Sequence, residues 1–433
     1  MDPLLIGTLL IGLLVIMLVL GTPIAVALAS TGIVGVLALR PWSAAEYLLA
    51  NFPYSYSASF SFIVLPLFLF MGYMAFEAGL ASKAFDAGQR WLGHIPGGLA
   101  IATVFGCAAF SAVCGSSVAT ASTMARSALP EMLKRGYRPM LGAGCVAAGG
   151  TLGVLIPPSG ILVVYSFVTE VSLVKLFIAA VIPGVLTAVV YMTGIYLMVK
   201  IWPSLAGPTG GIVRSSWRER FASLGRAWEV VFLFAVVMGS IYLGIATATE
   251  AAAVGAFFAM LVVLFRPNAM SKLKNGLWET GTGVSTIFFL IVGAGLFSMA
   301  ISLSQLPVTL AAGAMDLGVP RYVLFALIVL VYLVLGCLID GISMVLITMP
   351  IVFPIIQQLG YDPVWFGIII VKAVEIGCIT PPVGLNAYVV KAAVPEAPIG
   401  EIFKGCAPFV VMELLIIALM TAFPEIVLAL VPR

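Results

Sequence analysis

Two pairs of adjacent prolines, Pro157-Pro158 and Pro381-Pro382, each lie in an apolar stretch long enough to cross a membrane. Proline supplies no backbone N–H and disfavours helix at the residue before it, so a helix containing such a pair must unwind there. Freed carbonyl groups are costly in hydrocarbon, so unwound backbone is expected only where it lines a cavity or binds a ligand. A hard cation such as Na⁺ is well served by carbonyl and hydroxyl oxygens, and paired half-helix N-termini attract an anion.

Both proline pairs belong to one pattern, G-x-x-x-P-P-x-G, which begins at Gly153 and again at Gly377. The same separation of 224 residues relates Ser116, in one short polar turn, to Asp340, in another. Each turn therefore precedes its proline motif by 37 residues. Two features matched at one separation indicate an internal repeat.

Composition and charge place these motifs in a membrane. Of the 433 residues, 62% are apolar and 9% are charged, too few polar groups for the surface of a soluble protein. We therefore expect an all-α polytopic membrane protein with ten spans, and we interpret 98–128 and 322–358 as helical re-entrant hairpins. With the N-terminus outside, inner loops then hold sixteen of the 21 basic residues, as retention of basic residues inside requires. The two hairpins enter from opposite sides, so the repeats are inverted, as in many transporters.

The predicted organisation places scaffold helices before a transport repeat in each half of the chain. Its divisions are an N-terminal scaffold at 1–97, a first transport repeat at 98–200 with hairpin 98–128 and broken helix 140–167, an amphipathic cytoplasmic connector at 201–228, second-half scaffold helices at 229–321, and a second transport repeat at 322–433 with hairpin 322–358, broken helix 364–390 and C-terminal helix 407–430.

Individual polar residues leave more than one interpretation open. Asp340, a carboxylate in an apolar hairpin, indicates a functional site, although the alternative is that it caps the hairpin turn. The hydroxyls of Ser116 and Thr380 either bind a ligand or bond to the preceding helical turn. Lys372 and Glu375 are expected to neutralise each other. Glu413, with Glu77 and Glu250, is expected near a span end at the membrane interface.

Motifs for enzymatic chemistry are not found in the sequence. It contains no Walker lysine loop, no HExxH, no G-x-S-x-G and no cofactor fingerprint, and its six cysteines have no CxxC spacing. We therefore expect a protein that is not an enzyme, with no organic cofactor and no transition metal.

Three segments resemble the large membrane subunit of tripartite ATP-independent periplasmic (TRAP) transporters, of the DctM and SiaM type: G-G-T-L-G-V-L-I-P-P-S at 149–159, C-G-S-S-V-A-T-A at 114–121 and I-G-C-I-T-P-P-V-G-L-N at 376–386. The likeness spans essentially the whole chain. It implies sodium-driven uptake of an organic anion by an elevator movement, in which hairpins and broken helices slide against a scaffold. It also implies a bacterial inner membrane location with a periplasmic N-terminus.

The same resemblance implies two protein partners, a small four-helix membrane subunit and a periplasmic substrate-binding protein. Because the first span begins almost at the first residue, we expect the small subunit to be a separate chain. Selectivity would reside mostly in the binding protein, so the sequence leaves the substrate open among C4-dicarboxylates, sugar acids, keto acids and similar anions.

The family resemblance assigns each coupling sodium ion to one hairpin and its broken helix. The predicted ligands of one ion are Cys114, Ser116, Gly153, Ile156 and Pro158, and those of the other are Gly377, Thr380 and Pro381 with the second hairpin. Cys114 stands where serine is common, which weakens the first site only if the family uses that side chain. The substrate is expected between the hairpin tips, near Ser117, Asp340, Ser343 and Asn386.

Three alternatives remain beside this interpretation. A self-sufficient sodium–dicarboxylate symporter of related fold would transport free substrate without a binding protein. A channel would show unsaturable flux. A scaffold or sensor subunit would bind neither sodium nor anion, and sodium would not stabilise it against heat.

Overall fold

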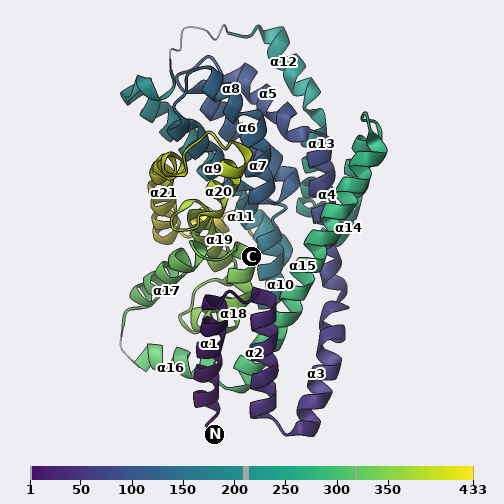
Figure 1. Cartoon of the computed structure of the whole chain (residues 1–433), viewed down its shortest axis with the longest axis vertical. Helices are drawn as coiled ribbons and strands as arrows, with labels where there is room; N and C mark the ends of the chain where they lie inside the picture. Colours follow the sequence, from purple (N-terminus) through teal and green to yellow (C-terminus); the bar gives the residue numbers. More distant parts are fainter. Residues whose placement is uncertain (1, 208–213, 317–318, 433) are drawn as a thin grey trace.

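The computed structural model describes residues 2–207, 214–316 and 319–432, and the described chain is helical without strands. The all-helical prediction is confirmed. Residues 208–213 of the predicted connector, 317–318 of the second scaffold, and the terminal residues 1 and 433 lie outside the described residues. In Figure 1, helices α5 (Leu80–Leu92), α8 (Leu129–Lys134) and α12 (Trp217–Arg226) lie at the end of the molecule opposite the N-terminus.

Among the described residues, five helices are long and apolar enough to cross a membrane, or up to seven if two bent pairs each form one span. The five are Pro139–Thr169, which contains the first proline break, α11 (Leu173–Ile201), α15 (Ala269–Leu303), α18 (Gly341–Gln358) and α21 (Ile399–Ala422). Shorter apolar helices are α1 (Pro3–Val19), α2 (Ile24–Leu39), α6 (Gly98–Cys114), α14 (Ala248–Leu264) and α17 (Arg321–Gly336). Ten full-length spans were expected, but several of those stretches form helices at or below the shortest length that crosses a bilayer.

One bent pair includes a helix that the sequence interpretation left inside a loop. Helix α4 (Val64–Glu77) turns by 62° at Gly79 into α5. Helix α5 carries Lys83 and Arg90 on one face but buries Phe85 and its apolar neighbours against α6. This segment is an amphipathic helix: its apolar residues recur at helical spacing on one face, and its charged residues lie on the other.

The other bent pair joins the connector to the second half: α12 and α13 (Trp228–Tyr242) meet at 53°.

The remaining elements are short or lie between the helices already named. Helix α3 (Trp42–Ser57) precedes the short 3-10 turn η1 (Phe60–Ile63), and a second 3-10 turn, η2 (Pro203–Leu205), follows α11. Helix α16 (Leu306–Asp316) lies between α15 and α17, and α22 (Glu425–Leu428) follows α21. The predicted C-terminal helix 407–430 therefore begins earlier, after Pro398, and ends at Ala422 before Pro424.

Close backbone packing joins segments far apart in the sequence. Helix α2 lies along α15 (Figure 1), and a Cβ added to Gly32 would lie 2.4 Å from the carbonyl carbon of Leu296. A Cβ on Gly293 would likewise lie 2.5 Å from the carbonyl oxygen of Ala25. Small residues permit this approach because they have little or no side chain between the two backbones. Such contacts matter in a membrane, where helices associate through packing rather than hydrophobic exclusion.

The two proline pairs interrupt two helices in the same way. Helix α9 (Pro139–Leu155) is followed by α10 (Gly160–Thr169), and α19 (Pro363–Ile379) is followed by α20 (Leu385–Ala393). Both Pro-Pro peptide bonds are cis. Each broken helix is paired with two helices joined by a short turn: α6 and α7 (Ser117–Ser127) for the first, α17 and α18 for the second.

Candidate functional site

At the first break, the chain leaves the helix in extended conformation and returns through a side-chain cap. Ile156 is extended, and Ser159 caps α10 by accepting from the N–H of Leu162 at 3.3 Å. The Ser159 hydroxyl also donates to the carbonyl of Val154, so one carbonyl freed by the prolines is satisfied locally. This break is enclosed, because Pro157, Pro158 and Ser159 are buried.

The second break has similar geometry but a different exposure. Thr380 is extended, and its hydroxyl donates to the carbonyl of Ile376 at 2.6 Å. Its side chain therefore takes the local bond that was the alternative to ligand binding, although the hydroxyl oxygen retains lone pairs. Pro381, Pro382 and Val383 are exposed. The two predicted ion sites are thus buried to different extents.

Each hairpin tip ends in a capped helix. Gly115 adopts the left-handed conformation, and Ser116 then caps α7 by accepting from the N–H of Ala119 at 3.4 Å. Asp340 caps α18, where its Oδ1 accepts from the N–H groups of Ile342 and Ser343, each at 3.1 Å. Asp340 does cap its hairpin turn, and the same side chain also lines a cavity, so capping does not remove it from the site.

The first hairpin tip packs directly on the first break. The N–H of Gly160 donates to the carbonyl of Gly115 at 3.5 Å, and a Cβ on Gly153 would lie 2.5 Å from the carbonyl oxygen of Ser116. The structure therefore brings Ser116, Gly153 and the segment containing Pro158 together, and their role as ion ligands stays a prediction.

The second tip meets its break in a different register. The N–H of Val383 donates to the carbonyl of Cys337 at 3.3 Å, and Gly377 packs on Gly336, four residues before Asp340. The 224-residue separation would have placed Gly377 against Asp340. The two halves are therefore matched in sequence but not superimposable in their contacts.

A cavity of about 310 Å³ lies where both tips, both broken helices and helices α4 and α15 meet. Its polar lining includes Ser116, Ser117 and Asp340 from the tips, with Tyr73 of α4 and Thr286 of α15 opposite them. Three predicted residues, two of them assigned to substrate, thus share one cavity.

Four helix N-termini converge on this cavity. The residues that begin α7, α10, α18 and α20 all line it: Ser117, Gly160, Gly341 and Leu385. Helix N-termini carry partial positive charge, so they favour an anion even where a side chain such as Ser116 or Ser159 accepts from one N–H group of the first turn. The lining holds one carboxylate, Asp340, and no lysine or arginine. The cavity can therefore offer backbone dipoles to an anion and a carboxylate to a cation.

Other predicted residues lie outside this cavity lining. Asn386 is fully buried and donates to the carbonyl of Ala147 at 3.1 Å, so it ties α20 to α9. Ser343 is buried beneath the tip of α18. The side chain of Ile156 faces Gly184 of α11, and the carbonyl of Cys114 faces Gly72 of α4.

A buried ionic cluster joins α11, α19 and α21 beside the site. Lys372 pairs with Glu375 at 2.5 Å, as expected, and also with Glu413. Lys372 also donates to Thr187 at 2.9 Å, and Tyr191 donates to Glu413 at 2.5 Å. The expectation that Glu413 is interfacial is wrong, because it is fully buried within α21. A carboxylate among apolar residues was the sequence signal for this cluster.

Comparison with known proteins gives a consistent assignment. Residues 11–426 match the family described as "Tripartite ATP-independent periplasmic transporter, DctM component". The chain is 38% identical to the C4-dicarboxylate TRAP transporter large permease protein DctM of Pseudomonas aeruginosa, over 86% of this chain and 87% of that protein. It is 31% identical to the ectoine/5-hydroxyectoine TRAP transporter large permease protein UehC of Ruegeria pomeroyi, over 96% of both chains.

The fold is also found in a solved transporter structure. The crystal structure of the YdaH transporter of Alcanivorax borkumensis superposes with a TM-score of 0.61 at 18% identity, covering 90% of this chain and 91% of that chain. At this level of identity the likeness concerns the fold.

Proposed function

Because this chain belongs to the DctM family of tripartite ATP-independent periplasmic transporters, whose members are large permeases, we propose that it carries a small organic carboxylate across the membrane, driven by a sodium gradient. The observation that carries the proposal is the convergence of four helix N-termini on a cavity whose lining has no basic side chain. Such a site binds an anion through backbone dipoles, which can release it more readily than a fixed ion pair would.

The substrate class rests on the same chemistry. The relatives described above are named for C4-dicarboxylates and for ectoine, compounds that share a carboxylate group. A carboxylate bound in the cavity would face the N-termini of α7, α10 and α20, whereas N–H groups in the first turn of α18 already donate to the carboxylate of Asp340. We propose the substrate carboxylate as the common element that the cavity recognises.

Sodium is proposed as the coupling ion at the two proline breaks. The carbonyl oxygen of Ser116 packs on Gly153 and that of Pro158 packs on Gly115, so neutral oxygens of the kind that suit a hard monovalent cation line this contact. The carboxylate of Asp340 is better suited to a neighbouring cation than to an anionic substrate, because like charges repel. We therefore assign Asp340 to cation attraction within the substrate cavity.

An elevator movement is proposed from the composition of the cavity wall. Tips and broken helices form one side, whereas α4 and α15 form the other. The contact between Gly72 of α4 and the carbonyl of Cys114 is close, since a Cβ there would lie 2.6 Å from that oxygen. A glycine at this contact leaves no side chain to obstruct sliding of one side past the other.

The proposed setting is a bacterial inner membrane with a periplasmic N-terminus. It is supported by α5, α8 and α12, which carry many basic residues and lie at the end opposite the N-terminus (Figure 1). The proposed partners are a small four-helix membrane subunit and a periplasmic binding protein that delivers the substrate.

The test is reconstitution of this chain with a small subunit and candidate binding proteins in liposomes. Uptake of a radiolabelled carboxylate should require the binding protein and an inward sodium gradient. Equal uptake without sodium would overturn the coupling mechanism. Uptake of free substrate by this chain alone would instead support the self-sufficient symporter.

A further inference from the structure

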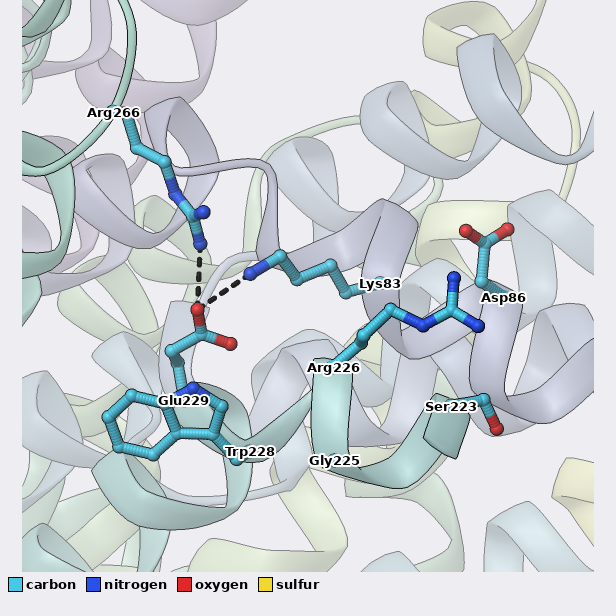
Figure 2. Close-up of a pocket in the computed structure, with 8 residues that line it drawn as sticks. All are labelled: Lys83, Asp86, Ser223, Gly225, Arg226, Trp228, Glu229 and Arg266. Carbon is cyan, nitrogen blue, oxygen red and sulfur yellow. Dashed lines mark hydrogen bonds and ion pairs between the residues drawn. The ribbon is translucent and has the colours of Figure 1, made fainter. Parts of the chain in front are cut away.

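A second cavity, of about 430 Å³, lies where α5, the junction of α12 with α13, and the segment after α14 meet. Glu229, in the first turn of α13, lines this cavity. Its Oε1 accepts from Lys83 Nζ at 2.6 Å and from Arg266 Nη2 at 2.7 Å, as Figure 2 shows. One carboxylate therefore serves two cations.

A third cation increases the positive charge of the cavity. Arg226, in the last turn of α12, extends between Lys83 and Asp86 in Figure 2. Within the described chain, neither Arg226 nor Asp86 has an ion-pair partner within 4.0 Å. Three cations thus line the cavity with two carboxylates, which leaves a net positive charge.

Hydrogen-bonding capacity also remains unused there. The Nε of Arg266, a donor, and the Oε2 of Glu229, an acceptor, are both buried without a partner in the described structure. A buried donor without a partner is costly, so a ligand with acceptor oxygens would be stabilised by it. A phosphate group is the anion that suits converging arginine and lysine side chains, because it accepts several charge-assisted hydrogen bonds.

The position of the cavity specifies the source of that phosphate. Glu229 lies at the start of the apolar helix α13, and Arg266 follows the end of the apolar helix α14. Trp228, at the edge of the cavity, is 53% exposed, and tryptophan prefers the level of lipid headgroups. Val231, about one turn further along α13, is 64% exposed, so apolar surface continues along this helix beyond Trp228.

We propose that this cavity binds the phosphodiester headgroup of an anionic phospholipid, from the leaflet that we infer to be cytoplasmic. The site lies apart from the substrate cavity and shares no lining residue with it. The bound lipid would hold α5, α12 and the end of α14 together at the membrane surface.

The test compares phosphatidylglycerol with phosphatidylcholine bound to the purified full-length chain, measured by native mass spectrometry and by thermal unfolding in detergent. Wild type should retain phosphatidylglycerol preferentially and melt at a higher temperature with it. Arg226→Gln should lower that preference about fivefold, because one headgroup-facing charge is lost. Arg218→Gln, on the same helix but not lining the cavity, is the matched control and should leave the preference unchanged.

Glu229→Gln provides a change of opposite sign. Removing this carboxylate raises the positive charge of the cavity, so phosphatidylglycerol retention should rise even if the helices pack less tightly. A purely structural ion-pair cluster would lose stability without gaining lipid. If this variant does not fold, Arg226→Gln still decides, since that side chain has no ion pair within the described chain.

Two further results would overturn the proposal. One is equal retention of both lipids by wild type, or an equal loss of preference in Arg226→Gln and Arg218→Gln. The other is stabilisation by glycerol phosphate or inorganic phosphate equal to that by phosphatidylglycerol, which would make a soluble phosphate the ligand. Neither readout needs sodium, substrate or transport, so the outcome is independent of the proposed function.

Discussion

Gly377 of α19 packs against Gly336 of α17 so closely that a Cβ on Gly377 would lie 2.3 Å from the carbonyl carbon of Gly336. Both partners of this contact are backbone, so neither can move aside as a flexible side chain would. The contact places the second broken helix on the second hairpin. Glycine is required there for close approach, because neither residue has a left-handed conformation.

Gly377→Ala should therefore push α19 away from α17 and lower transport strongly, with a loss of stability of about 1–3 kcal/mol from overpacking. Gly281→Ala is the matched control: it lies in α15 with nothing within 4 Å of an added Cβ, so it should be neutral or stabilising. Thermal unfolding and sodium-driven uptake should be measured on both. Equal behaviour of the two variants would show that the Gly377 contact is not tight in the membrane.

Ser116→Ala and Thr380→Ala should each raise the sodium concentration for half-maximal transport, by about fivefold if one neutral oxygen contributes about 1 kcal/mol. Thr421→Ala is the control for Thr380, since its hydroxyl makes the same bond to the preceding turn, to Ile417 at 2.7 Å, in α21. Unchanged sodium dependence in both test variants would mean that backbone carbonyls suffice or that the ions bind elsewhere.

Asp340→Asn separates capping from charge. Asparagine caps a helix about as well as aspartate, so stability should be retained, whereas Asp340→Ala should cost about 1 kcal/mol. If the carboxylate attracts the coupling cation, Asp340→Asn should still raise the half-maximal sodium concentration in uptake assays. Wild-type sodium dependence in a stable Asp340→Asn protein would reduce this residue to a cap.

Lys372→Met should destabilise the protein by about 3–5 kcal/mol, because it leaves Glu375 and Glu413 buried without their cation. Glu375→Gln should be milder, since Glu413 still pairs with the lysine. Lys404→Met, at an exposed position of α21, is the control. If Lys372→Met melts at the same temperature as Lys404→Met, the prediction is contradicted.

His94 should make the packing of the connector on α5 sensitive to pH. Burial, with the charges of Arg214 and Arg220, lowers the pKa of His94 from its ordinary 6.5. Because the pKa of His94 is lower in the folded protein than in the unfolded chain, protonation favours the unfolded chain. The folded state is therefore most stable above about pH 6.5, and it loses this stability as the pH falls through the folded-state pKa. Acidification should therefore loosen α12.

The measurement for this prediction is limited proteolysis of the connector from about pH 7.5 to about pH 5.5, with tryptophan fluorescence in parallel. Trp91 reports directly, since its Nε1 donates to the carbonyl of Arg220 at 3.1 Å. His94→Gln should abolish the pH dependence. A variant that retains the wild-type pH profile would assign the effect to another group.

Local chemistry made the broken helices predictable from the sequence. Pro157-Pro158 and Pro381-Pro382 interrupt a helix whatever surrounds them, and the hydropathy of the flanking residues places each break within an apolar segment. The repeat was predictable for the same reason, because Gly153 and Gly377 begin identical patterns. Helix α5 was not predicted, because its charged residues lower the mean hydropathy of the segment below that of a membrane-spanning helix although its apolar residues recur at helical spacing.

Long-range packing decided the rest. The convergence of α7, α10, α18 and α20 on one cavity, the contact of Gly377 with Gly336 rather than Asp340, and the burial of Glu413 all depend on how distant helices are arranged. A sequence specifies where a helix begins and ends through interactions of neighbouring residues. Which helix ends meet is determined by shape-complementary packing among segments hundreds of residues apart, and only the tertiary structure contains that information.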